Sequence, residues 1–129
     1  MKISHIGYCV ECIDSSVNTF KMLGYSQKSD IFYDKSKDCY ICFLENSDIC
    51  VKLIEPASSD SVINHLLNGH GKQDYHLCYE TTAFEQDVLN LCEKGFEVFP
   101  KEHGGHYLQE NAVFLSNEKV GFIEVHNAS

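Results

Sequence analysis

The feature that most constrains the fold of this 129-residue chain is an internal repeat. The stretch "HIGYCVECIDSSVNTFKMLGY" (5–25) aligns without a gap over "HLCYETTAFEQDVLNLCEKGF" (76–96). This alignment places His5 on His76. A chain that repeats its pattern over this length is predicted to contain two copies of one structural module.

The later parts of the two halves also correspond. The stretch "ICFLENSDICVKLIEP" (41–56) matches "AVFLSNEKVGFIEVHN" (112–127), in which the pair Phe-Leu recurs at the same place. One inserted residue then places Lys52 on Glu124. The order of features is therefore the same throughout both halves.

Each half is predicted to form a strand, a helix and three further strands. In the first helix, Asp14 is the N-cap candidate and Gly24 the expected stop. In the second helix, Thr82 or Thr81 is the N-cap candidate and Gly95 the stop. The pattern predicts an α+β fold made of two βαβββ modules.

The remaining strands are expected at 25–33, 37–46, 48–55, 96–101, 108–116 and 119–126. We expect a single domain over 1–129, with module one at 1–56, a connecting segment at 57–72 and module two at 73–127. The connecting segment is predicted to hold a short helix at 59–68.

Two C-x-x-C pairs, at 9–12 and 39–42, raise the question of a zinc site. The stretch around Cys39 and Cys42 alternates like a strand, so these two side chains are expected on opposite faces. Neither pair has the tight turn of a zinc knuckle. We therefore interpret the cysteines as small buried hydrophobic residues with reduced thiols.

Composition excludes several classes of function. The net charge of −9 argues against binding to nucleic acid, whose phosphates favour a basic surface. No apolar run approaches the length of a membrane span, and the first residues lack the pattern of a signal peptide. We expect a cytoplasmic protein with no membrane partner.

Four residues are predicted to form the functional site. If the two modules pack with pseudo-two-fold symmetry, the equivalent positions converge in pairs: His5 with His76, and Lys52 with Glu124. Two histidines and a carboxylate that point into one cavity would make a metal site.

At this point the sequence resembles the vicinal oxygen chelate superfamily. The segments "SHIGYCVECIDSSVNTFKMLGY", "VKLIEP", "DYHLCYE" and "VGFIEV" carry the resemblance, which extends from residue 2 to about 127. The glyoxalase I and methylmalonyl-CoA epimerase branch is the most similar. The resemblance implies a cupped, open β-barrel around a divalent metal ion (Zn, Ni, Co, Mn or Fe) and a homodimer.

The resemblance also implies the ligands. His5, His76 and Glu124 match three of the four metal ligands of the superfamily, but the fourth position holds Lys52. A protonated lysine has no lone pair and cannot bind a metal. Three outcomes stay open: a metal held by the other three residues, a metal-free enzyme in which Lys52 stabilises an oxyanion, or a metal-free binding protein of the bleomycin-resistance type. Glu55, on the other face of its strand, is not expected to be a ligand.

The branch implies a lyase or isomerase that removes a proton next to a metal-bound carbonyl of a small-molecule substrate, with acyl thioesters as one substrate class. Glu124 is the expected base, and Lys52 the second catalytic candidate. The stretch that supplies a second acid in some epimerases offers Tyr40 and no inward-facing carboxylate. Glu45, Asp34 and Glu110 are open substitutes. A dioxygenase is disfavoured, because "LSNEKVGFIEV" lacks the Asp-Pro of that branch.

Six further residues are candidates for the mouth of the site. They are Lys35, Lys37, Lys72 and Lys101 as a basic rim for a CoA phosphate, and His103 and His106 beside a Gly-Gly pair. The simpler interpretation is that the lysines are surface residues and that the loop with the two histidines is a hairpin connection.

Overall fold

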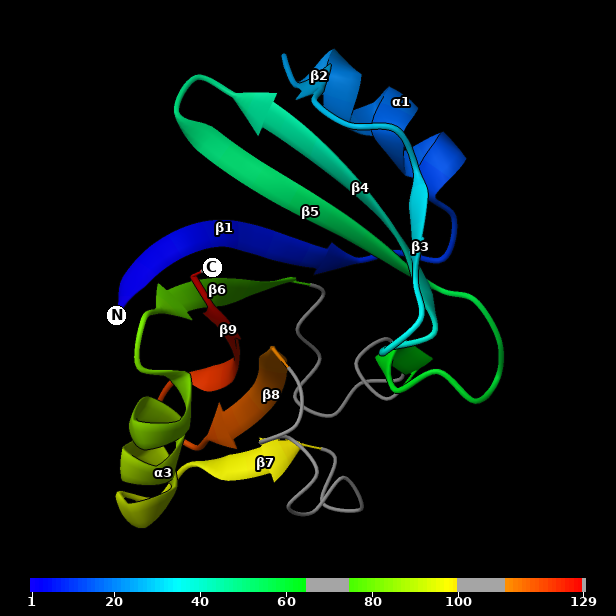
Figure 1. Ribbon diagram of the computed structural model, residues 1–129. Helices are drawn as coiled ribbons and strands as arrows, with labels where there is room; N and C mark the ends of the chain where they lie inside the picture. The colour runs from blue at the N-terminus through cyan, green and yellow to red at the C-terminus, as the bar shows by residue number, and fades with distance from the viewer. Residues whose placement is uncertain (65–74, 100–110, 129) are drawn as a thin grey trace. The chain divides into compact units, whose positions relative to one another are not determined.

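The computed structural model describes residues 1–64, 75–99 and 111–128 and consists of two compact units (Figure 1). The N-terminal unit holds His5–Tyr75, and the C-terminal unit holds Met1–Ser4 together with His76–Ser129. None of the described helices is long and apolar enough to cross a membrane.

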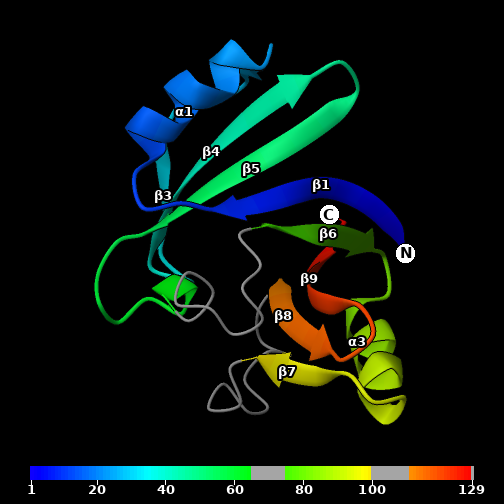
Figure 2. The same ribbon diagram turned by 180° about the vertical axis from the view of Figure 1, so that it is seen from behind.

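In the N-terminal unit, the helix packs on one face of a sheet whose strand order is β2-β4-β5-β1. The strand β3 also pairs with β4. In Figures 1 and 2, α1 lies along β4 and β5. The elements are β1 (Lys2–Cys9), α1 (Ile13–Met22), β2 (Ser26–Gln27), β3 (Phe32–Asp34), β4 (Cys39–Asn46) and β5 (Ile49–Pro56).

The C-terminal unit repeats this arrangement. Its strand order is β6-β9-β8-β7, and α3 contacts β9. The elements are β6 (Tyr75–Thr81), α3 (Phe84–Glu93), β7 (Glu97–Phe99), β8 (Ala112–Asn117) and β9 (Gly121–Asn127). Each half is thus a strand, a helix and further strands, which confirms the predicted α+β class and the βαβββ modules.

The strand register shows where the repeat gains its extra residue. In the first hairpin Asn46 pairs with Ile49, so the turn between β4 and β5 has two residues. In the second hairpin Asn117 pairs with Gly121, so the turn between β8 and β9 has three. Gly121 has a φ of +76°, which a glycine adopts without strain. The insertion therefore lies in a hairpin turn and leaves the equivalence of Lys52 and Glu124 intact.

Both helices end at the glycines that the sequence predicts. Gly24 has a φ of +97° and Gly95 a φ of +107°. The N–H of Tyr25 donates to the carbonyl of Phe20 at 3.2 Å, and that of Phe96 to the carbonyl of Leu91 at 3.0 Å. This is the Schellman arrangement, in which a left-handed residue closes the last turn.

The predicted N-caps are wrong. The first helix begins at Ile13, so Asp14 lies in the first turn, and no side-chain cap comes from Cys12. The N–H of Ile13 instead donates to Oε1 of Glu55 at 2.8 Å, so the neighbouring strand β5 supplies the acceptor. A cap from a distant strand has no signature in the local sequence.

The second helix begins at Phe84, with Ala83 at the cap position and no side-chain cap. Neither predicted threonine therefore occupies the N-cap position. Thr81 still organises this end of the helix: its hydroxyl accepts the N–H of Ala83 at 3.0 Å and donates to Asp87. The entry into the helix is held by the last residue of the preceding strand.

The strand expected at 25–33 is interrupted. It forms the short β2 and β3, and the residues between them turn away from regular pairing. The N–H groups of Lys28 and Ser29 both donate to the carbonyl of Phe43, at 2.8 and 3.2 Å. The hydroxyl of Ser29 accepts the N–H of Phe43 at 2.9 Å. A side chain thus takes the place of a backbone partner, as at a β-bulge.

The cysteines that raised the zinc question are free thiols, and Cys39 and Cys42 lie in β4 as expected. Cys42 is fully buried in the apolar cluster beneath α1, and Cys39 is 1% exposed. In the connecting segment, residues 63–64 are helical, and the rest of the predicted helix lies outside the described residues.

Candidate functional site

One sheet face of the C-terminal unit carries His76 and Glu124. The parallel pairing of β6 with β9 places Cys78 opposite Glu124. His76 is two residues from Cys78, so all three side chains leave the sheet on the same face. The alternate residues Ile123 and Val125 pack in the apolar cluster with α3. The helix therefore covers one face, and the ionisable side chains occupy the other.

The side chains of His76 and Glu124 are 4% and 3% exposed, although both residue types prefer water. The ring of His76 meets the ring of Phe114 edge-on, with centroids 5.4 Å apart and an interplanar angle of 87°. Phe114 is also the strand neighbour of Glu124 on β8. One aromatic ring thus supports the imidazole beside the carboxylate.

The N-terminal unit presents the same arrangement. Lys52 pairs with Gly7 on β1 and with Phe43 on β4. The ring of His5 meets that of Phe43 edge-on, with centroids 5.8 Å apart and an interplanar angle of 89°. His5 and Lys52 are 9% and 8% exposed. The alternate residue Leu53 packs beneath α1.

The two faces differ in chemistry at two equivalent positions. Glu124 and Cys78 in the C-terminal unit stand where Lys52 and Gly7 stand in the N-terminal unit. One face therefore combines an imidazole with a carboxylate and a thiol, and the other combines an imidazole with an ammonium group. The histidine and its supporting phenylalanine are common to both.

Cys50, two residues before Lys52 on β5, is a thiol with a raised pKa. Burial raises the pKa of Cys50, and Glu45 adds to this increase. The positive charges of Lys28 and Lys52 act in the opposite direction.

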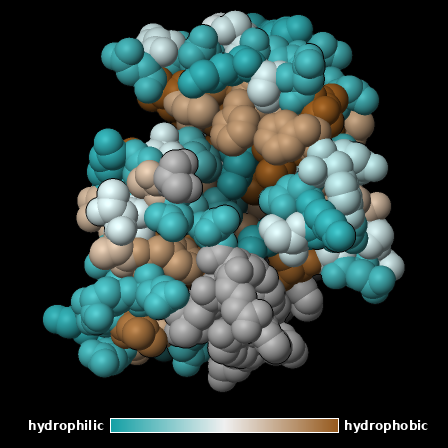
Figure 3. Space-filling view, in the orientation of Figure 1, coloured by the Kyte–Doolittle hydropathy of each residue, from teal (hydrophilic) through white to brown (hydrophobic). Residues whose placement is uncertain are grey.

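Aromatic side chains extend the face of the N-terminal unit. Phe32 on β3 stacks on Phe43, with centroids 6.1 Å apart, and is 44% exposed. Figure 3 shows brown and tan side chains gathered where Figure 1 draws the strands of this unit. An apolar part of a ligand could pack on such a surface.

The predicted metal ligands have the right chemistry. His5, His76 and Glu124 offer two imidazoles and a carboxylate, a set that suits Mn, Fe, Co and Zn. Lys52 offers only donors. A four-ligand set of the usual kind is therefore excluded, and a three-ligand set fits the residues present.

Sequence reasoning overlooked Cys78. It is fully buried, and its Sγ lies within 4.8 Å of a carboxylate oxygen of Glu124. The alternation of β6 could have identified it, because it is two residues from His76 and must share its face. Interpreting all the cysteines as small hydrophobic residues hides this signal.

Three candidates for a second acid lie within the described residues, and each has a different environment. Tyr40 lies on the strand face of Cys42, toward the helix, and not on the face of Phe43. Glu45 is exposed and does share the face of Phe43. The carboxylate of Asp34 accepts hydrogen bonds from the backbone and hydroxyl of the nearby Ser36, at 3.0 and 2.8 Å. Asp34 is thus the last residue of β3, and its carboxylate holds the turn that follows the strand.

Among the residues proposed for the rim, Lys35 is exposed and Lys37 is 7% exposed, so Lys37 is not an ordinary surface lysine. The other rim candidates and one candidate acid lie outside the described residues: Lys72, Lys101, His103, His106 and Glu110.

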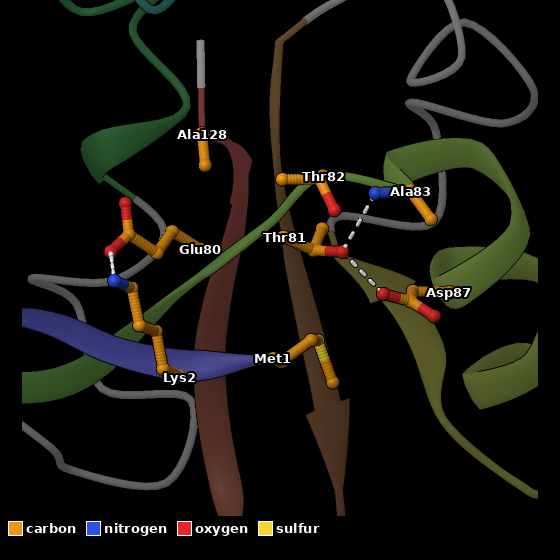
Figure 4. Close-up of a pocket in the computed structure, with 8 residues that line it drawn as sticks. All are labelled: Met1, Lys2, Glu80, Thr81, Thr82, Ala83, Asp87 and Ala128. Atoms are coloured by element: carbon orange, nitrogen blue, oxygen red, sulfur yellow. Dashed lines mark hydrogen bonds and ion pairs between the residues drawn. The ribbon is translucent and has the colours of Figure 1, made fainter.

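A separate cavity of about 410 Å³ opens in the C-terminal unit (Figure 4). Its polar side chains bond to one another: Lys2 pairs with Glu80 at 3.4 Å, and Thr81 bonds to Asp87. These pairs account for the charged groups that line the cavity. We assign it a structural role at the start of α3.

Comparisons with known proteins agree with the fold described above. Residues 4–112 match the family model described as the Glyoxalase/Bleomycin resistance protein/Dioxygenase superfamily. The match includes His5, Lys52 and His76 and ends before Glu124. No curated protein matches the chain.

Three solved structures share the fold. A hypothetical protein, BH1468 from Bacillus halodurans C-125, has a TM-score of 0.76 at 21% identity and covers 99% of this chain and 94% of its own. A methylmalonyl-CoA epimerase in complex with methylmalonyl-CoA and NH4+ has a TM-score of 0.72 at 19% identity, with coverage of 99% and 94%. A variant of the Streptomyces coelicolor methylmalonyl-CoA epimerase in complex with 2-nitronate-propionyl-CoA has a TM-score of 0.73 at 18% identity, with coverage of 100% and 95%. The chain belongs to the Glyoxalase/Bleomycin resistance protein/Dioxygenase superfamily.

Proposed function

We propose that this protein is an isomerase of the epimerase type that moves a proton on the carbon next to a carbonyl group, with an acyl thioester as the substrate class. The observation that carries the proposal is the burial of Glu124, at 3% exposure, on the same sheet face as His76. The likeness to epimerase structures with acyl-CoA ligands supports the substrate class.

In this proposal Glu124 is the base. A carboxylate in a poorly hydrated site accepts a proton from carbon more readily than one in water, because burial destabilises its charged form. Phe114 on the neighbouring strand restricts where that carboxylate can point. Glu124 would take the proton from the substrate and return it, and a change of face on return gives epimerisation.

We propose that His5, His76 and Glu124 hold a divalent metal ion. Such an ion, when bound, stabilises the enolate oxygen by several kcal/mol. Each histidine is held by a phenylalanine ring that meets it edge-on, which orients the imidazole before a ligand arrives. Both imidazoles are predicted to bind as neutral rings.

A metal-free variant of the mechanism is favoured by one specific observation. Lys52 is 8% exposed and occupies the position of the missing ligand, so a buried lysine stands there in place of a carboxylate. An ammonium can donate a hydrogen bond to a developing oxyanion.

The first experiment measures metal content by mass spectrometry on untagged protein, comparing wild type with Lys52→Glu. The matched control is Lys35→Glu, which makes the same charge change at an exposed lysine. A near-stoichiometric metal in the wild type supports the three-ligand site. An empty wild type beside a loaded Lys52→Glu variant supports the metal-free mechanism, provided that Lys35→Glu stays empty.

The second experiment follows exchange of the proton next to the carbonyl in deuterated water, with methylmalonyl-CoA as the first probe. We expect exchange in the wild type and a loss of about 10²–10⁴-fold in Glu124→Gln, as for removal of a general base. Unchanged exchange in that variant would refute the role of Glu124. No exchange with any thioester, together with retained ligand binding in Glu124→Gln, would identify a binding protein instead.

A further inference from the structure

A thiol and a carboxylate lie together on the functional face of the C-terminal unit. Cys78 on β6 pairs directly with Glu124 on β9. The Sγ atom and a carboxylate oxygen are within 4.8 Å of each other. The two residues are 0% and 3% exposed. Both groups are metal-ligating types, and neither faces bulk water.

The repeat shows that a thiol is not required by the module itself. The equivalent position on β1 is Gly7, which pairs with Lys52 in the same register. A strand of this module therefore tolerates a residue with no side chain at this place. The thiol is present only in the half that also carries the carboxylate, where it can act with Glu124 on the same ion.

We propose that Cys78 is a further metal ligand of this protein, beside Glu124. The inference deepens the proposed function, because it rests on the metal site assigned there. When the ion binds, the Sγ–H bond breaks, its proton leaves to solvent, and a metal–sulfur bond forms without any change of oxidation state. Cys78 thus supplies the ligand that Lys52 cannot.

The geometry is compatible with a shared ion. In a tetrahedral zinc site with Zn–S near 2.3 Å and Zn–O near 2.1 Å, sulfur and oxygen lie about 3.6 Å apart. The observed separation is at most 4.8 Å, so the displacement that a shared ion requires is about 1.2 Å or less. A thiolate also changes which metal is preferred, because soft sulfur ligands favour Zn²⁺ and Co²⁺ over Mn²⁺ and Mg²⁺.

Cobalt titration of the metal-free full chain tests this proposal, because a thiolate bound to Co²⁺ gives a charge-transfer absorption in the near ultraviolet. We expect the band in the wild type, its loss in Cys78→Ser, and its retention in the control Cys92→Ser on α3. The affinity for Zn²⁺ should fall roughly tenfold or more in Cys78→Ser, with a smaller change for Mn²⁺.

The outcomes separate this inference from the proposed function. Cobalt binding without the band, or a band that persists in Cys78→Ser, overturns the role of Cys78 and leaves the three-ligand site in place. Absence of cobalt binding in the wild type overturns both. If Cys78→Ser does not fold, ¹¹³Cd NMR of the wild type decides, because a sulfur ligand shifts the cadmium resonance far downfield and oxygen or nitrogen ligands do not.

Discussion

Replacement of Glu55 tests how the first helix is attached to the sheet. The Oε1 atom of Glu55 accepts the N–H of Ile13 at 2.8 Å, and Ile13 is 1% exposed. This N–H is among the helix-start donors that have no partner inside the helix. Without Glu55 this partly buried donor would lose its acceptor.

The loss of folding free energy can be estimated from the hydrogen bond and the charge that each Glu55 variant removes. A buried donor left without its partner costs about 1–3 kcal/mol, and loss of an N-cap side chain about 0.5–2 kcal/mol. These figures describe the same lost bond, so we expect about 2 kcal/mol for Glu55→Ala. Glu55→Gln keeps an oxygen acceptor and loses only the charge near the helix start, which is worth about 0.3–1 kcal/mol.

Urea unfolding followed by circular dichroism measures the free energy of unfolding of Glu55→Ala and Glu55→Gln. The m-value should be the same as in the wild type. Asp14→Ala is the matched control, because Asp14 is the residue that local sequence reasoning assigns as the cap, although it lies in the first turn. It should cost about 0.3–1 kcal/mol from the helix dipole alone. A cost for Asp14→Ala equal to or above that of Glu55→Ala would refute the reasoning. Metal content should be unchanged in both variants.

Three other predictions test different parts of the chain. Gly95→Ala should destabilise by about 1–2 kcal/mol in urea, because φ is +107° while a Cβ would lie 3.9 Å from its nearest neighbour. Phe114→Ala should cost about 3–5 kcal/mol and weaken metal binding, measured by calorimetry. Hydrogen bonds from Ser58 and Tyr33 lower the pKa of Asp38. The stabilisation from these bonds is therefore present above the unfolded pKa of Asp38 and lost as the pH falls through its lowered pKa. Asp38→Asn should lower the melting temperature at neutral pH, and its difference from wild type should shrink as the solution is acidified.

The repeat made the fold predictable, because it is visible in the order of the residues. Strand alternation and glycines at helix ends are local signals, and both halves show them, as at Gly24 and Gly95. The interrupted strand at 25–33 was not predictable, because the hydroxyl of Ser29 bonds to the backbone of a strand far along the chain. The same applies to the cap from Glu55, which is 42 residues from its partner.

The site was predictable to the extent that the repeat pairs its residues. The equivalence of Lys52 and Glu124 required an inserted residue, and the two hairpin turns place it between β8 and β9. The neighbour of each ionisable residue on the adjacent strand was not visible in the alignment. Strand register is needed to see that Gly7 stands beside Lys52 and Cys78 beside Glu124.

The asymmetry at these positions is the main clue to the chemistry. At two equivalent buried positions, one unit carries the carboxylic acid of Glu124 and the other the amine of Lys52. A carboxylate is a common metal ligand, whereas a protonated lysine has no lone pair to offer. The metal-ligating types at these positions are therefore found in the C-terminal unit, where Cys78 lies beside Glu124. A soft ligand such as Cys78 would add affinity for the ion, and this is why the behaviour of Lys52→Glu and Cys78→Ser should be interpreted together.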